Sequence, residues 1–247
     1  MRNIAKFIVA ASLAVLSTPA SAGFIVTYEA AGVTNSTAGF DYFGIETFDG
    51  KVGQTHFTST FNHDGVQIDL EYKDVVVIPA DQFGGAGGSD YGVAGLNSPN
   101  RTYTIDITTS VDDQPGNGVN YFGYWLSALD GQNFVSFYKD GTKVFEFAPT
   151  DVLTLLAGKP DYWGHPVTGE NSKEPYVFLN FFYEGGTFDR VVFTQGPGSA
   201  GYESDNHTLG FYNRRSGNPV DPIPEPAALG LIGVGLLGIA GLRRRRA

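Results

Sequence analysis

The chain has 247 residues, no cysteine and a formal net charge of −10. The lack of cysteine excludes disulfide bonds and thiol chemistry. Outside residues 23–224 lie six of the 16 basic residues but only one of the 26 acidic residues, so residues 23–224 have a net charge of −15. Such an acidic surface repels the phosphate backbone, which excludes nucleic-acid binding. The 33 glycines and the 14 % of aromatic residues favour strands joined by tight turns.

Residues 1–22 have the features of a secretory signal peptide. Two basic residues near the start precede a ten-residue apolar run, and the small residues Ala20 and Ala22 form a cleavage site before Gly23. A bilayer-spanning helix needs about 20 apolar residues, so this run is too short for a permanent anchor. We therefore predict that signal peptidase cleaves the chain after Ala22.

Residues 23–213 are predicted to form one all-β domain. Asp-Gly pairs at residues 64–65, 130–131 and 140–141 and a Gly-Gly pair at residues 185–186 separate extended runs. Such pairs supply the positive φ angles that tight hairpins need. The runs on either side of these pairs are therefore predicted to form an antiparallel meander.

Hydrophobic alternation predicts two packed sheets. Tyr103, Ile105 and Ile107 alternate with polar neighbours, which is typical of a strand with one wet face, whereas residues 177–183 are apolar on both faces apart from Asn180. Two packed sheets would bury both kinds of strand. We predict an antiparallel β-sandwich that is jelly-roll-like and similar to carbohydrate-binding modules, with a short helix from Thr150.

Three aromatic residues are candidates for sugar binding, because a flat ring face covers a pyranose ring. Tyr162 and Trp163 lie in a polar loop, where a tryptophan has less reason to be buried. Trp125 is the third candidate, but Tyr124 and Trp125 point to opposite faces of one strand, so one of them is expected in the core. The Gly-rich segment 81–100 is either a binding loop or a mobile surface loop.

Glu203, Asp205 and Asn206 are the candidate ligands for Ca²⁺, because hard cations prefer oxygen donors, although the same residue types also serve turns and strand ends. The four histidines show no zinc-binding spacing, and neither a nucleophile elbow nor a phosphate-binding loop is present in the sequence. We therefore name no catalytic residue, expect no enzymatic activity, and consider Ca²⁺ as the one cofactor.

Residues 214–223 are predicted to be a Pro-rich, extended and solvated linker. The uncharged run at residues 227–242 would reach roughly 24 Å as a helix, which spans a ~30 Å hydrocarbon core only marginally. The arginines that follow would stay on the cytoplasmic side and stop transfer. These membrane-stop residues are Arg243, Arg244, Arg245 and Arg246.

The tail has three parts in order: Pro224, Glu225 and Pro226, then the apolar helix, then the arginine cluster. This arrangement at residues 224–247 resembles the PEP-CTERM sorting signal. The resemblance implies processing by the membrane enzyme exosortase, which would convert a membrane-anchored intermediate into a protein of the cell surface or extracellular matrix. It also implies a Gram-negative host that makes exopolysaccharide.

Residues 119–212 are similar to the bodies of a group of exosortase-dependent surface proteins. The shared phrases are an FG-x-YW strand, an SFY strand, an FDRVVF strand and a closing segment, here residues 203–206. The resemblance implies a sugar-binding type of sandwich without a transferable activity. We expect a non-enzymatic exported surface or matrix protein that binds exopolysaccharide. The alternatives are a secreted carbohydrate-active enzyme on a β-sandwich scaffold and a Ca²⁺-stabilised structural adhesin.

Overall fold

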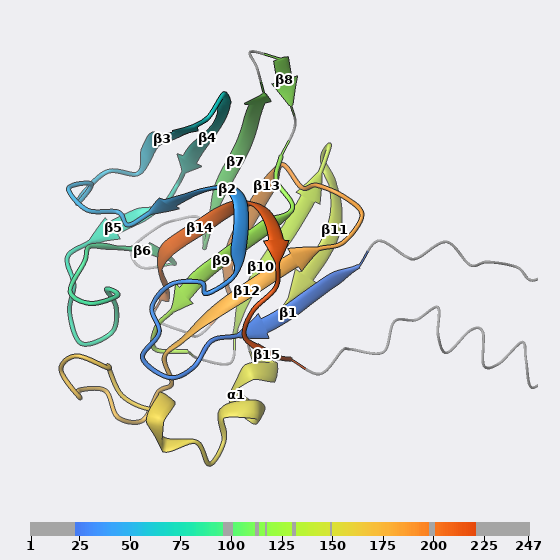
Figure 1. The fold of residues 1–247 in the computed structure, drawn as a ribbon. Helices are drawn as coiled ribbons and strands as arrows, with labels where there is room; N and C mark the ends of the chain where they lie inside the picture. Colours follow the sequence, from blue (N-terminus) through green and yellow to red (C-terminus); the bar gives the residue numbers. More distant parts are fainter. Residues whose placement is uncertain are drawn as a thin grey trace, which may run out of the picture.

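The structure, a computed structural model, shows two antiparallel sheets that face each other, with one short helix at one end (Figure 1). The residues that it describes are 23–95, 101–111, 114–116, 118–129, 132–148, 150–197 and 201–220.

Several predicted features lie outside the described residues. These are the signal peptide with Ala20 and Ala22, the sorting motif, the apolar run at residues 227–242 and the arginine cluster. Among the residues that the structure does describe, none of the helices has the length and apolar character needed to cross a membrane.

Sheet A contains eight strands: β1 (Phe24–Tyr28), β2 (Gly39–Glu46), β5 (Val76–Ile78), β6 (Tyr91–Ala94), β9 (Tyr121–Leu126), β12 (Val177–Tyr183), β14 (Tyr202–Arg214) and β15 (Asn218–Pro219). Their order is β15-β1-β12-β9-β14-β6-β5, and β2 pairs with β14 as an additional strand. The long strand β14 therefore has β9 along one edge and contacts both β6 and β2 along the other.

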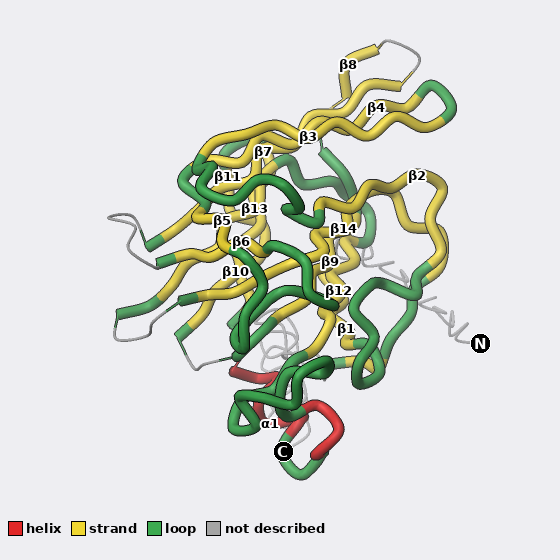
Figure 2. The backbone as a smooth tube through the Cα atoms, turned by 90° about the vertical axis from the view of Figure 1, so that its left-hand side faces the viewer, coloured by secondary structure: helices red, strands yellow, loops and turns green. Residues whose placement is uncertain are grey.

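Sheet B contains seven strands: β3 (His56–His63), β4 (Val66–Lys73), β7 (Thr102–Val111), β8 (Gln114–Gly116), β10 (Asn133–Lys139), β11 (Thr142–Phe147) and β13 (Arg190–Gln195). Their order is β11-β10-β13-β7-β4-β3, and β8 pairs with β7. The helix α1 (Thr150–Leu156) confirms the predicted helix from Thr150. Figure 2 shows it at the end of the sandwich opposite the β3–β4 hairpin.

The predicted alternation is confirmed in the core between the sheets. Tyr103, Ile105 and Ile107 on β7 are at most 1 % exposed and belong to one apolar cluster. Strand β12 lies between β1 and β9 and is buried along almost its whole length, as expected for a strand that is apolar on both faces. A strand of this kind is stable only where both of its faces are covered.

Two of the predicted hairpins are confirmed. Asp64 and Gly65 have φ angles of 43° and 80° and join β3 to β4. Asp140 and Gly141 have φ angles of 48° and 76° and join β10 to β11. Two successive residues with positive φ define the turn whose twist matches that of paired strands.

The predicted meander is wrong at two other turns. Strand β9 lies in sheet A and β10 in sheet B, and the Gly185–Gly186 turn connects β12 in sheet A to β13 in sheet B. A glycine pair permits the chain to reverse, but it does not decide whether the next strand pairs beside the previous one or crosses to the facing sheet. Here the chain crosses, so that strands of sheet B cover the inner faces of β9 and β12, which carry Phe122 and Phe181 in the core.

A histidine lies inside the sandwich. His207 on β14 is fully buried, with its ring stacked on Phe193 at a centroid distance of 5.2 Å. Its Nδ1 lies 3.0 Å from the hydroxyl of Tyr72, and its Nε2 lies 3.5 Å from that of Tyr103. Burial lowers the pKa of His207 to about 3, so the imidazole is neutral at physiological pH.

The folded domain continues beyond the predicted boundary at residue 213. Strand β14 runs to Arg214, and β15 then pairs with β1, so that the part of the predicted linker up to Val220 is docked on the sandwich. The linker was predicted from its proline content, which favours extended backbone, and extended backbone also suits a strand at a sheet edge.

Candidate functional site: an aromatic face on sheet A

Five aromatic rings form a contiguous cluster on sheet A. The ring centroids of Phe43 and Phe40 lie 5.0 Å apart, and those of Phe40 and Tyr121 lie 4.8 Å apart. The series continues from Tyr121 to Phe182 at 5.1 Å and from Phe182 to Tyr212 at 4.9 Å. We call these five residues the outer-face aromatic cluster; they come from β2, β9, β12 and β14.

The cluster lies on the face of sheet A that points away from sheet B. Phe122 and Phe181 belong to the apolar core between the sheets, whereas their chain neighbours Tyr121 and Phe182 do not. Successive side chains of a strand point to opposite faces of its sheet. Tyr121 and Phe182 therefore point outward, and the rings in contact with them share that face.

A β-bulge explains how β2 presents two rings on one face. Phe40 pairs with Tyr212 and Phe43 pairs with Gly210, so three steps along β2 match two steps along β14, with Asp41 as the extra residue. The bulge brings residues three apart to the same side of the strand. Gly210 allows the close approach, because a Cβ atom there would lie only 2.7 Å from the Cα of Phe43.

Part of the cluster is open to solvent. Phe43 is 46 % exposed, and Phe40 and Tyr212 are partly exposed. Tyr121 and Phe182 are fully buried beneath them. The cluster thus offers three accessible rings on a base of two fixed ones.

The rim of the cluster is polar. Asn213 Nδ2 donates a hydrogen bond to Asp41 Oδ1 at 2.7 Å, and Asn120 Oδ1 accepts one from the backbone N–H of Tyr212 at 3.0 Å. The exposed Arg214 lies beside Gly39 and forms no ion pair with any carboxylate that the structure describes. Rings with hydrogen-bonding groups beside them suit a ligand that has both apolar faces and hydroxyl groups.

The structure places Trp125 in the interior, together with Tyr124. Trp125 is 1 % exposed and packs with Tyr176 and Phe178 beneath the Gly-rich loop. Tyr124 is buried on the opposite face, where its hydroxyl lies 2.5 Å from that of Tyr202. A stacking platform needs an exposed ring face, and Trp125 has none, because the loop and the segment around Tyr176 cover it.

Tyr162 and Trp163 lie near α1, and both have intramolecular partners. Tyr162 is 9 % exposed, and its hydroxyl donates to the carbonyl oxygen of Glu29 at 3.0 Å. Trp163 is partly buried against the main core, and its Nε1 donates to the carbonyl oxygen of Leu156 at 3.1 Å. Trp163 and Trp125 belong to different apolar clusters, so the sugar-binding residues predicted from the sequence do not form one surface.

The side chain of Asp205 holds the Gly-rich loop in place. Its Oδ2 accepts hydrogen bonds from the backbone N–H of Ala86 at 2.7 Å and from Ser89 Oγ at 2.5 Å, and its Oδ1 accepts one from the N–H of Asn206 at 2.6 Å. Burial raises the pKa of Asp205 to about 7, although these three hydrogen bonds act in the opposite direction.

The other two candidate Ca²⁺ ligands lie beside Asp205 on β14 but do not complete a cation site. Asn206 Nδ2 donates to the carbonyl oxygen of Thr34 at 2.9 Å, and Glu203 is partly exposed. Across the described segments, no group of three or more acidic or histidine side chains is arranged to hold a metal ion.

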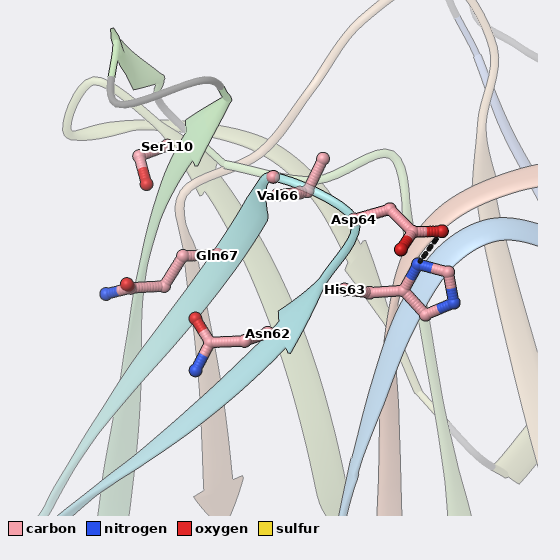
Figure 3. A pocket seen from close by; sticks show the side chains of 7 residues that line it. Asn62, His63, Asp64, Val66, Gln67 and Ser110 are labelled. Carbon is pink, nitrogen blue, oxygen red and sulfur yellow. Dashed lines mark ion pairs between the residues drawn. The ribbon is translucent and has the colours of Figure 1, made fainter.

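A shallow hollow of about 240 Å³ lies at the tip of the β3–β4 hairpin. Figure 3 shows Asn62 and Gln67 pointing to one side of the hairpin, while Asp64 and His63 form a pair on the other side, with Nδ1 and Oδ2 3.4 Å apart. The lining contains no Phe, Tyr or Trp ring. The outer-face aromatic cluster therefore matches the chemistry of sugar recognition better than this hollow does.

Comparison with known protein families matches the PEP-CTERM protein-sorting motif at residues 222–246, which confirms the resemblance seen in the tail. None of the curated proteins and none of the solved structures with which the chain was compared matches it. The chain therefore carries a PEP-CTERM protein-sorting motif, the mark of an exported, transiently membrane-anchored protein that an exosortase-like enzyme processes.

Proposed function

We propose that the domain is a non-enzymatic surface or matrix protein that binds exopolysaccharide through the outer-face aromatic cluster. The observation that carries this proposal is the exposed ring of Phe43, 46 % accessible, beside the partly exposed rings of Phe40 and Tyr212. Sugar rings have apolar faces that pack on aromatic rings, and their hydroxyl groups suit a polar rim such as Asp41 and Asn213.

The winding of the chain supports a jelly-roll scaffold of the kind found in carbohydrate-binding modules. If the short strand β8 at the edge of β7 is left out, the eight strands from β6 to β14 visit the sheets in the order A, B, A, B, B, A, B, A. Their strand orders are β6-β14-β9-β12 and β7-β13-β10-β11. This pairing corresponds to two Greek keys in a double-sheet jelly roll, an architecture also used by lectin domains. A scaffold does not define a ligand, so the aromatic cluster carries the functional argument.

The PEP-CTERM motif and the predicted signal peptide support a final location at the cell surface or in the extracellular matrix of a Gram-negative bacterium. There the acidic domain would remain among secreted polysaccharide after the membrane segment has been removed. Signal peptidase and the exosortase-like enzyme would act on the two ends of the chain, and the glycan would be the partner of the mature domain.

A second candidate function is that of a carbohydrate-active enzyme. One observation favours it: Asp205 has a pKa of about 7, and Glu203, two residues away on β14, is expected on the same face of the strand. Glycosidases use two such carboxyl groups, one of them protonated. Against it, the Asp205 carboxyl is fully buried and accepts three hydrogen bonds.

The test is a polysaccharide-binding assay with purified residues 23–220 and the exopolysaccharide of the producing strain. Phe43→Ala is expected to weaken binding about fivefold, because an aromatic contact contributes about 1 kcal/mol. Phe83→Ala is the matched control, since Phe83 is 40 % exposed but lies in the Gly-rich loop.

Two results would decide against the proposal. If Phe43→Ala and Phe83→Ala bind equally well, the outer-face aromatic cluster is not the binding site. If the polysaccharide acquires new reducing ends during the assay, and Asp205→Asn abolishes them, the enzyme is the better description.

A further inference from the structure

The last described residues form a strap across the edge of sheet A. This strap, residues 215–220, leaves β14 and reaches β1, and its path can be followed in Figure 1 from β14 to β15. Pro219 pairs with Thr27, and the backbone N–H of Val220 donates to the carbonyl oxygen of Val26 at 3.0 Å. At its start, Arg215 forms an ion pair with Glu184 at 3.0 Å. The strap therefore ties the end of the domain to the first strand of the mature chain.

A buried carboxylate anchors the strap. Glu29 is 3 % exposed, and its Oε1 accepts hydrogen bonds from Ser216 Oγ at 2.8 Å, from Asn180 Nδ2 at 3.1 Å and from the N–H of Thr37 at 3.0 Å. Thr27 Oγ1 also donates to the carbonyl oxygen of Ser216 at 2.7 Å. Hydrogen bonds to a buried charged group are stronger than those between neutral groups, so Ser216 is held from both of its polar sides.

The residue that follows Ser216 is suited to close docking. Gly217 has a φ angle of 79°, and a Cβ atom there would lie 2.7 Å from Thr27 Oγ1 and 2.9 Å from the carbonyl oxygen of Tyr28. A larger residue at this position would both strain the backbone and push the strap away from β1. The local sequence is therefore matched to the docked position.

The strap ends next to the sorting motif. Val220 is two residues from the start of the matched motif at residue 222, and six residues separate Val220 from the apolar run that begins at residue 227. Six extended residues reach about 20 Å, whereas a domain of about 200 residues has a radius of gyration of about 16 Å and is correspondingly wider than this tether. While the strap is docked, only these six residues connect the folded domain to the apolar run.

We infer that the strap must leave β1 before the exosortase-like enzyme can engage the motif, so that opening of the strap sets the rate of processing. Enzymes that bind peptides in extended form need accessible backbone on both sides of the bound residues. Opening of residues 215–220 adds six residues to the tether and roughly doubles its reach. This inference rests on the sorting step, and it is independent of glycan binding.

The first experiment locks the strap. Thr27→Cys with Pro219→Cys places two thiols on paired residues of β1 and β15, at a spacing that suits a disulfide. The native chain has no cysteine, so no other disulfide competes. The full chain is expressed in a strain that carries the processing enzyme, and conversion of the precursor is followed by pulse–chase.

The oxidised double variant should persist as precursor at least about tenfold longer than the reduced double variant or either single-cysteine variant. Equal conversion of the oxidised and reduced forms would overturn the inference. A wild-type chain that is never processed would overturn it as well, and it would also refute the sorting step, whereas the glycan-binding assay would be unaffected.

The second experiment loosens the strap. Ser216→Ala removes one hydrogen bond to Glu29 and should speed processing about tenfold, if the open form becomes more populated by that factor. Ser36→Ala is the matched control, because Ser36 Oγ donates to Asn180 Oδ1 at 2.8 Å in the same buried network without contacting the strap. If Ser36→Ala accelerates processing as much as Ser216→Ala does, general destabilisation is the cause and the inference fails.

Discussion

Two buried groups on β14 should give the domain opposite responses to pH. Burial lowers the pKa of His207 from 6.5 to about 3 and raises the pKa of Asp205 from 3.8 to about 7. Between pH 3.8 and pH 6.5 the unfolded chain binds a proton on His207 that the folded chain lacks. Over the same interval the folded chain keeps a proton on Asp205 that the unfolded chain has released.

The two contributions have the same size and opposite signs. The His207 term raises the free energy of unfolding by about 1.4 kcal/mol for each unit of rising pH, and the Asp205 term lowers it by about the same amount. The stability due to His207 is complete above pH 6.5 and is lost as the pH falls, whereas that due to Asp205 is complete below pH 3.8 and is lost as the pH rises. The two terms therefore cancel in the wild type.

Single substitutions should expose each term. His207→Gln cannot be protonated, so its free energy of unfolding should fall with rising pH relative to wild type, by about 1.4 kcal/mol per unit. Asp205→Asn should show the opposite relative slope. Each variant also loses stability at every pH, because His207 contacts the Tyr72 hydroxyl and Asp205 accepts hydrogen bonds from the Gly-rich loop. The readout is therefore the slope of the free energy of unfolding against pH, not its absolute value.

The measurement is urea unfolding of residues 23–220 at several values between about pH 4 and about pH 6.5, with all three proteins in the same buffers. Other titrating groups contribute equally to each protein and disappear from the difference. If the three curves run parallel, His207 and Asp205 have the same proton affinity in the folded and unfolded chains, and the reasoning from burial is refuted.

Two further substitutions test packing. Gly44→Ala should destabilise the domain by about 1–3 kcal/mol in urea unfolding, because a Cβ atom there would lie closer to the Phe61 ring than van der Waals contact allows. An unchanged unfolding midpoint would show that the Phe61 ring moves aside at no cost. Trp163→Ala should lower stability by about 2 kcal/mol through lost packing and the lost hydrogen bond to Leu156, with glycan binding unchanged; a stable variant that no longer binds glycan would restore Trp163 as a ligand residue.

The sequence predicted aromatic residues as the candidates for sugar binding, but it did not show which aromatic rings are exposed. It predicted aromatic stacking by Trp125, Tyr162 and Trp163, the last because a tryptophan in a polar loop has less reason to be buried. In the structure Trp125 is 1 % exposed while Phe43 is 46 % exposed, so Phe43 and not Trp125 offers an accessible ring. One local signal was present: in the segment Phe40-Asp41-Tyr42-Phe43 three aromatic residues break strict alternation, as a bulged strand does.

Local turn chemistry predicted hairpins correctly only where the next strand stays in the same sheet. The positive φ angles at Asp64 and Gly65 join paired strands, as expected. The Gly185–Gly186 turn instead carries the chain between sheets. The choice depends on which surfaces remain uncovered after both sheets form, and no window of neighbouring residues contains that information.

Taken alone, the sequence determined the sorting motif, the all-β class and the alternating strands, because each depends on residues that are close together in the chain. Only the tertiary structure decided which rings stay exposed, that Asp205 binds a loop 119 residues away, and that Ser216 reaches Glu29 across 187 residues. These contacts arise when distant strands pack, and burial then decides whether a tryptophan, a carboxylate or a proline-rich segment serves the interior or the surface.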